Sequence, residues 1–134
     1  MIRYLLDTNI CIFVLRGRLN GLASLFNARA NHLAISSATL AELIYGAEKS
    51  VKPEANLVVV EGFTARLAVL PFDDTAAAHS GQIRAELERQ GRPIGHYDLM
   101  IAGHARALGL VVVTNNRREF ERVPGLRVED WAKA

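Results

Sequence analysis

Two aspartates of this chain occupy positions at which a charged side chain is unusual. Asp7 directly follows residues 2–6, a hydrophobic run that predicts a strand buried on both faces. Asp98 lies three residues before Ile101 and therefore continues the apolar stripe of a predicted helix. Because burying an unpaired charge is costly, such an aspartate is normally a helix cap, a member of an ion pair or a metal ligand. We therefore expect functional roles for both, with helix capping as an open alternative for Asp98.

The other acidic candidates are less distinctive. Glu42 lies on the opposite face of its predicted helix from the apolar stripe, so periodicity predicts a solvated side chain. Glu119 and Glu121 are surrounded by arginines and would fit surface ion pairs. The apolar stripes of the two helices consist of Leu40, Leu43, Ile44 and Ala47, and of Ile101, Ala105 and Leu108. Periodicity alone therefore supports only Asp7 and Asp98.

Several common kinds of catalytic site lack their usual signals. The spacing of His79, His96 and His104 is not that of metal ligands, which argues against a zinc hydrolase. The chain has neither a Gly-x-Ser-x-Gly elbow nor a glycine-rich phosphate loop followed by Lys and Ser or Thr. Phosphoaspartyl enzymes need a second aspartate two residues after the first, where this chain has Asn9. The single cysteine, Cys11, cannot form an internal disulfide, and we expect it to be a small buried residue.

Length and composition favour one domain. The chain has 134 residues, of which 50% are hydrophobic, and this suits a single domain over residues 1–134. No apolar run reaches the roughly 20 residues of a membrane helix, and the first apolar stretch is too short for a secretion signal. We therefore expect a cytoplasmic protein that does not enter a membrane. The net charge of +2 permits nucleic-acid binding without demonstrating it.

Short β-branched runs alternate with helical patterns along the whole chain. Strands are predicted at residues 2–6, 32–36, 67–72, 110–114 and, as an edge strand, 126–130. Helices are predicted at residues 7–17, 19–30, 36–50, 53–67, 73–91, 97–109 and 115–123. This alternation predicts an α/β sandwich with a mainly parallel sheet, whose strand ends meet at one edge. Asp7, Asp73, Asp74, Asn115 and Asn116 are expected at that edge.

Four segments together resemble a known family. They are "LLDTN" at residues 5–9, "TLAELIYGAEKS" at 39–50, "IGHYDLMIAGHARALGL" at 94–110 and "VVVTNNRREFERVPGLRVEDW" at 111–131. In this order they resemble the PIN-domain ribonuclease toxins of VapC type, the toxic half of bacterial VapBC toxin–antitoxin modules. The resemblance implies a PIN-like three-layer sandwich and an endoribonuclease that depends on Mg²⁺ or Mn²⁺.

The resemblance also implies a catalytic site. It places Glu42 over the sheet edge with Asp7 and Asp98, and it implies a fourth acid in "TNNRREF". Asn116 stands where many PIN domains have that acid, so Glu119 is the expected carboxylate. Crowded carboxylates need a cation, and all-oxygen ligation selects Mg²⁺ or Mn²⁺.

Roles within that site follow from its chemistry. Asp7 and Asp98 are expected to hold the ion. Glu42 and Glu119 are expected to hold a second ion or to orient the attacking water. Supporting hydrogen bonds are expected from Thr8, Asn9, Thr114, Asn115 and Asn116.

The expected partners are RNA, an antitoxin and a second copy of the chain. RNA contacts are expected from Arg117 and Arg118, with solvated surface as the alternative. Initiator tRNA, cut in its anticodon loop, is the target that the resemblance implies; another tRNA, ribosomal RNA or mRNA are alternatives. Apolar residues beyond the needs of one core face could line a groove for a VapB-type antitoxin, or all be core. These residues are Ile10, Phe13, Leu22 and Phe26. An alternative function is a PIN-like protein that binds RNA or its antitoxin without cutting.

Overall fold

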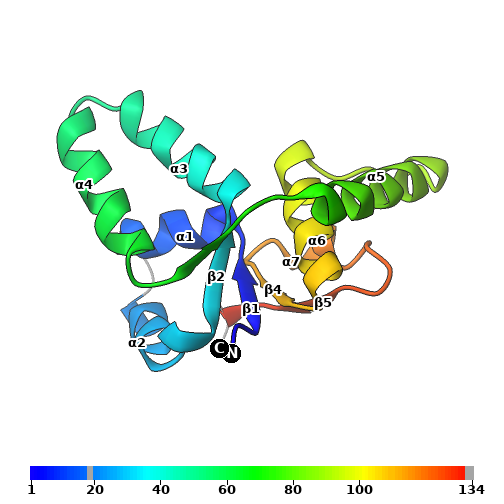
Figure 1. Ribbon diagram of the computed structural model, residues 1–134, viewed down its shortest axis with the longest axis horizontal. Helices are drawn as coiled ribbons and strands as arrows, with labels where there is room; N and C mark the ends of the chain where they lie inside the picture. The colour runs from blue at the N-terminus through cyan, green and yellow to red at the C-terminus, as the bar shows by residue number, and fades with distance from the viewer. Residues whose placement is uncertain (18–19, 132–134) are drawn as a thin grey trace.

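A parallel sheet forms the centre of the molecule (Figure 1). The computed structural model describes residues 1–17 and 20–131, leaving aside the side chains of 20–23, and within these residues the sheet has five strands. They are β1 (Tyr4–Leu6), β2 (Leu33–Ser36), β3 (Ala68–Leu70), β4 (Val111–Val113) and β5 (Arg127–Glu129). The order across the sheet is β3-β2-β1-β4-β5, and every neighbouring pair is parallel. The predicted mainly parallel sheet is confirmed.

Helices connect the strands and pack against both faces of the sheet. They are α1 (Thr8–Leu15), α2 (Asn20–Ala28), α3 (Ser37–Glu48), α4 (Pro53–Thr64), α5 (Asp74–Arg89), α6 (His96–Leu108) and α7 (Arg117–Phe120), with a 3₁₀ turn, η1, at Ala30–His32. The elements match the predicted ones in order and kind, and most are shorter at their ends. None of the helices within the described residues combines the length and apolarity that a membrane span requires.

Alternating residues of the buried strands divide the core into two halves. Leu5 and Val112 point into a cluster with α5, α6 and α7, whereas Leu6 and Val113 point into a second cluster with α1 to α4. Two clusters form because strands buried on both faces present apolar side chains alternately to each. Figure 1 shows α3 and α4 on one side of the sheet and α5 and α6 on the other. The result is the predicted three-layer sandwich.

The strand order creates one position at which the connections diverge. The chain runs from β1 through β2 to β3, and then returns past β1 to form β4 and β5. The helix after β1 therefore covers one face, and the helix after β4 covers the other. In open parallel sheets the crevice beyond such a pair of strand ends is the usual ligand site. Asp7 follows β1 and Thr114 follows β4, so both stand at this crevice.

Polar residues at strand ends also begin the helices. Asp7 caps α1, the Ser36 hydroxyl accepts from the Ala38 N–H at 3.1 Å to cap α3, and Asp73 caps α5. Gly17 ends α1 as predicted, with a φ of 64° that other residues rarely adopt. Asp73 and Asp74 lie at the edge of the sheet as expected, but both are exposed and Asp73 serves as a cap.

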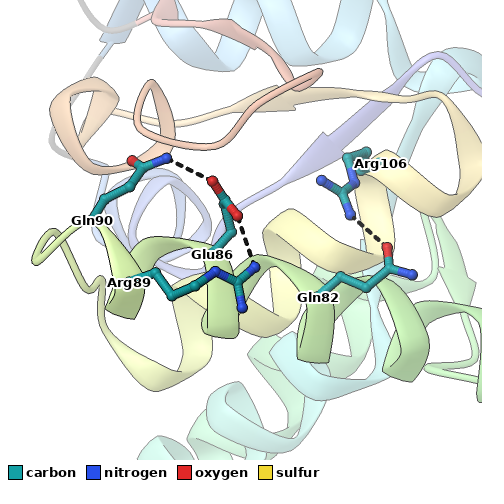
Figure 2. Close-up of polar contacts among 5 residues, drawn as sticks. All are labelled: Gln82, Glu86, Arg89, Gln90 and Arg106. Carbon is teal, nitrogen blue, oxygen red and sulfur yellow. Dashed lines mark hydrogen bonds and ion pairs between the residues drawn. The ribbon is translucent and has the colours of Figure 1, made fainter.

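A network of partly buried and exposed polar side chains joins α5 to α6. Arg106 on α6 donates to Gln82 at 3.1 Å and to His79 Nδ1 at 3.0 Å, both on α5. Figure 2 shows the Arg106–Gln82 contact beside a second one, in which Glu86 accepts from Arg89 and Gln90. These contacts lie at the surface, so the two helices depend mainly on close packing.

Gly103 on α6 is the point of closest approach to α5. A Cβ at this position would lie 2.0 Å from Ser80 Oγ and 2.7 Å from Ser80 Cα. Because a backbone atom cannot move aside alone, we expect Gly103→Ala to lower the free energy of unfolding by about 1–3 kcal/mol. Urea denaturation measures the change. Gly81→Ala on α5 is the matched control, since its Cβ would meet nothing within 4 Å; it should be neutral or stabilising by about 1 kcal/mol. Equal losses in both variants would contradict the packing argument.

Candidate active site

Asp7 directly follows β1 and caps the N-terminus of α1. Its Oδ1 accepts from the Ile10 N–H at 2.8 Å, and its Oδ2 accepts from the Thr114 hydroxyl at the end of β4. The residue is 0% exposed. Burial is the main reason that the pKa of Asp7 is raised to about 6, and the hydrogen bonds from Thr114 and Ile10 oppose this rise. The charges of Glu42 and Asp130 act in the same direction as burial.

Glu42 on α3 lies against the start of α1. Thr8 Oγ1 donates to Glu42 Oε1 at 2.7 Å, and Thr8 Oγ1 also lies 3.2 Å from Thr39 Oγ1. Glu42 is half-buried, and its charge acts on both Asp7 and Asp98. The solvated position predicted from periodicity is therefore wrong, and Ile44 of the predicted stripe is instead 39% exposed.

Asp98 and Glu119 form a carboxyl pair between α6 and α7. The pKa of Asp98 is raised to about 8, mainly by burial. The hydrogen bond with Glu119 and the charge of Glu119 add to this rise, and the charges of Asp7 and Glu42 contribute further. Two carboxyl groups can share a hydrogen bond only when one holds a proton. The residue at the cap position of α6 is Gly95, without a side-chain capping bond, so capping does not explain Asp98. Leu108, predicted to share its apolar stripe, is 50% exposed.

The polar residues expected to support the carboxylates divide into two groups. Thr8 and Thr114 donate to carboxylates, and the Asn116 N–H donates to Thr114 Oγ1 at 2.8 Å. Asn9 is exposed, and no hydrogen bond joins it to a carboxylate within the described residues. The expectation that Asn9 fixes the site is therefore wrong, because its position in α1 turns it toward solvent.

Three residues near the carboxylates were not predicted. Asp130 follows β5 as Asp7 follows β1, and its charge acts on Asp7. Thr39 adjoins Thr8, and Gly95 leaves space for Asp98, whose Oδ2 would lie 3.4 Å from a Cβ at that position. The strand-end rule that identifies Asp7 could have found Asp130. Thr39 and Gly95 have no comparable signal in the sequence.

The possible metal ligands at this edge of the sheet are all oxygen atoms, and one of them lacks a hydrogen-bond partner among the described residues. Asn115 Oδ1 is buried and has no hydrogen-bond partner among the described residues. In that part of the chain no group of three His, Cys, Asp or Glu side chains is arranged to hold an ion alone. Mg²⁺ needs no such group, because it keeps several waters and binds through one or two carboxylates. Asp7 and Asp98, both with raised pKa values, therefore fit a hydrated divalent cation.

The arginines of α7 differ in their pairing. Arg117 and Arg118 are both exposed, but Arg117 donates to Glu121, one turn further along the chain. Arg118 forms no ion pair within residues 1–17 and 20–131. Glu119 and Glu121 were both candidates for surface ion pairs. Glu121 forms such a pair with Arg117, whereas Glu119 bonds to Asp98.

The apolar residues of α1 and α2 lie mostly in the core. Ile10 is 0% exposed and packs in the core between the sheet and α1 to α4, so the expectation that it lines an antitoxin groove is wrong. Phe26 belongs to the same core cluster and is 6% exposed, but it also lines a small cavity with Val14 and Phe63, so its expected contact with an antitoxin stays a prediction. Phe13 is half-buried. The side chain of Leu22 lies outside the described residues. Counting apolar residues on α1 overestimates its free surface because this helix packs against the sheet, α3 and α4 together.

Comparisons with known proteins agree with this geometry. The PIN domain family matches residues 4–126. The tRNA(fMet)-specific endonuclease VapC of Shigella flexneri is 60% identical over 132 residues, which cover 98% of this chain and 100% of that protein. Ribonuclease VapC2 of Haemophilus influenzae is 52% identical over 131 residues, covering 98% and 99% of the two chains.

Solved structures give the same answer. The DNA-bound VapBC complex of Salmonella typhimurium contains a chain that is 60% identical and superposes with a TM-score of 0.94, covering 98% of this chain and 99% of that one. This likeness confirms the PIN-like fold. The chain therefore belongs to the PIN-domain family and, within it, to the VapC ribonucleases.

Proposed function

We propose that this ribonuclease cuts the anticodon loop of initiator tRNA as the toxin of a toxin–antitoxin module. The observation that supports the proposal is the crowding of Asp7, Glu42, Asp98 and Glu119 at the diverging strand ends. The name of the 60% identical Shigella flexneri relative, a tRNA(fMet)-specific endonuclease, supplies the substrate.

Asp7 and Asp98 would hold a magnesium or manganese ion, as PIN-domain nucleases generally depend on a divalent metal. Such an ion polarises the scissile phosphate and lowers the pKa of a coordinated water. Thr114 fixes the orientation of the Asp7 carboxylate through its hydroxyl. Thr8 donates to Glu42, which would orient the attacking water or accept its proton. Glu119 orients the same water from the side of α7.

A single-stranded loop suits this site better than a duplex. The carboxylates stand in a crevice above the sheet edge, and the scissile phosphate has to enter it. Splayed loops expose a phosphate together with its neighbouring bases, whereas an A-form helix keeps its bases stacked and its major groove narrow. Arg117 and Arg118 on α7 border the crevice next to Glu119 and supply contacts to flanking phosphates.

Arg118 is expected to contribute more to RNA affinity than Arg117, because Arg117 is already paired with Glu121. Arg118→Ala should weaken RNA binding and reduce the slope of log affinity against log salt by about 0.7, as one lost contact to a single strand does. Arg117→Ala should change the slope less. Both slopes can be measured by filter binding between about 50 and 300 mM salt. The arginine substitutions are made in the Asp7→Asn variant, which is expected to be inactive, so that the RNA stays intact. An unchanged slope in Arg118→Ala would show that Arg118 makes no phosphate contact and is an ordinary solvated surface residue.

The partner antitoxin and self-association belong to the same proposal. The cognate VapB-type antitoxin would lie along α1 and α2, with Phe13 and Leu22 among its contacts. Ile12, Leu15 and Val59 line a cavity between α1, α3 and α4 that also contains Glu42, so an antitoxin helix bound along this apolar wall would block the access of RNA to the carboxylates. A homodimer would use the exposed apolar residues of α4, where Val58 is 67% exposed.

Incubating the protein with total bacterial RNA and Mg²⁺, and then mapping the new ends, tests the proposed function. A dominant cut in the anticodon loop of initiator tRNA supports it. An intact initiator tRNA beside a cleaved ribosomal RNA or a different tRNA refutes the substrate. No metal-dependent cut beyond that of Asp7→Asn would refute the activity and favour a protein that binds without cutting.

A further inference from the structure

Tyr97 is an exposed aromatic residue directly beside the carboxylates. It precedes Asp98 in the first turn of α6, and 49% of it is exposed, whereas Leu99 and residues 101–105 of the same helix are buried. Among the phenylalanines, tyrosines and tryptophan whose side chains the structure describes, only Tyr97 and Tyr45 are exposed to this degree. An exposed ring next to the site calls for an explanation.

Few specific contacts hold the Tyr97 ring in the described part of the chain. No hydrogen bond of its hydroxyl is present in the described part of the chain. Its one ring contact there is with His96, edge to face, with centroids 6.0 Å apart and planes at 76°. With 49% of the residue exposed, the ring remains accessible to a ligand. The ring of Tyr45 differs, because Lys49 Nζ lies 4.8 Å from its centroid.

Tyr97 shares a cavity with catalytic-site residues. The cavity has a volume of about 570 Å³ and is lined by Thr8, Glu42 and Tyr97, together with residues of α1, α3 and α4. Glu42 thus lines the same cavity as the ring, and Asp98 follows Tyr97 in the chain. A base bound in this cavity would therefore lie beside both Glu42 and Tyr97.

We propose that Tyr97 stacks on the nucleobase next to the scissile phosphate and thereby positions the RNA strand for cleavage. This inference rests on the proposed function, and it assigns a substrate-positioning role to a residue outside the carboxylate set.

A neutral aromatic contact is compatible with the charge of the site. Asp7, Glu42, Asp98 and Glu119 repel the phosphates of the substrate whenever they are ionised. Stacking between a base and an aromatic ring does not depend on the sign of the surrounding charge, and every base offers a π face. Single-stranded RNA loops present such unstacked bases. Arg16 and Lys49 also line the cavity, and Tyr97 adds a contact to the base whose strength does not depend on these charges.

The first test compares three variants on the anticodon stem-loop of initiator tRNA under single-turnover conditions with Mg²⁺. Tyr97→Ala should lower kcat/KM by about 5- to 150-fold, the range that one base–aromatic stack provides. Tyr97→Phe keeps the ring and should stay within about twofold of the wild type. Leu108→Ala, at the other end of α6 and equally exposed, should leave cleavage unchanged. Thermal unfolding of all variants checks that none loses its fold.

The second test removes the base instead of the ring. An RNA with an abasic nucleotide beside the mapped cut should lower wild-type cleavage about as much as Tyr97→Ala does. The variant itself should barely distinguish the two RNAs, because the shared interaction is already absent. A merely structural role of Tyr97 would give equal losses on both RNAs and would overturn the proposal.

Other outcomes are equally informative. If the wild type cuts the stem-loop and Tyr97→Ala cuts it equally well, the ring does not position the substrate. If Tyr97→Ala cuts normally but escapes inhibition by the co-expressed VapB antitoxin, the ring is an antitoxin contact and the proposal fails. If the wild type cuts no RNA at all, the proposed function fails first, and this inference fails with it.

Discussion

Replacing Asp7 by asparagine is expected to abolish RNA cleavage while making the metal-free protein more stable at neutral pH. The loss of activity should reach at least about a thousandfold, because several kcal/mol of transition-state stabilisation depend on anionic ligation at this position. Asparagine retains a side-chain oxygen that can accept from the Ile10 N–H, so α1 stays capped. The fold should therefore survive the substitution.

The gain in stability follows from the raised pKa of Asp7. Its pKa rises from 3.8 to about 6 on folding. Between these two pH values the folded protein therefore holds a proton that the unfolded chain has already released. The associated stability is complete below about pH 3.8 and is lost as the pH rises through about 6. At pH 7 the buried charge costs about 3 kcal/mol. An asparagine side chain does not ionise, so part of this cost should be recovered as a higher free energy of unfolding.

Urea denaturation and RNA cleavage assays at pH 7 measure the two effects together. Asp74→Asn makes the same chemical change at an exposed position and should alter stability by less than about 0.5 kcal/mol, with cleavage unchanged. Added Mg²⁺ should stabilise the wild type but not Asp7→Asn. An Asp7→Asn variant that is less stable than the wild type would contradict the burial argument, and one that cuts normally would contradict the metal assignment.

Asp7 and Asp98 could be found from the sequence because each interrupts an apolar pattern. A strand that ends in a carboxylate and an apolar helix stripe that begins with one are both local signals. The alternation of strands and helices likewise predicts the three layers. The order of the strands is not a local property, so the sequence pattern predicted that Asp7 and Thr114 follow strands ending at the same edge without showing that β1 and β4 are neighbours.

Glu42 and Glu119 illustrate where local patterns fail. A helical wheel assumes one buried face, but α3 packs against the sheet, α1, α4 and α6. Its polar face toward α1 is therefore enclosed, and Glu42 bonds to Thr8 there, while Ile44 of the apolar stripe is exposed. Glu119 sits among arginines in the sequence, yet the short helix α7 turns it to Asp98. Only the family resemblance pointed to these two acids.

Asp98 and Glu119 are expected to make the binding of Mg²⁺ strongly dependent on pH. The pKa of Asp98 is raised from 3.8 to about 8, first by burial and then by the hydrogen bond and charge of Glu119. The folded, metal-free protein therefore holds a proton here that the unfolded chain releases at lower pH. The corresponding stability is complete below about pH 3.8 and is lost as the pH rises through about 8. A cation has to displace this proton before Asp98 can ligate it.

Isothermal titration with Mg²⁺ between about pH 6 and pH 9 measures this competition. One displaced proton should raise the apparent affinity about tenfold per pH unit below about pH 8, and the affinity should level off above it. Glu119→Gln removes one negative charge and offers Asp98 an N–H donor, so the plateau should begin at lower pH. Glu121→Gln is the matched control, because Glu121 is exposed and pairs with Arg117 instead. An affinity that is flat over this range, or a plateau that moves equally in both variants, would show that the carboxyl pair does not hold the proton.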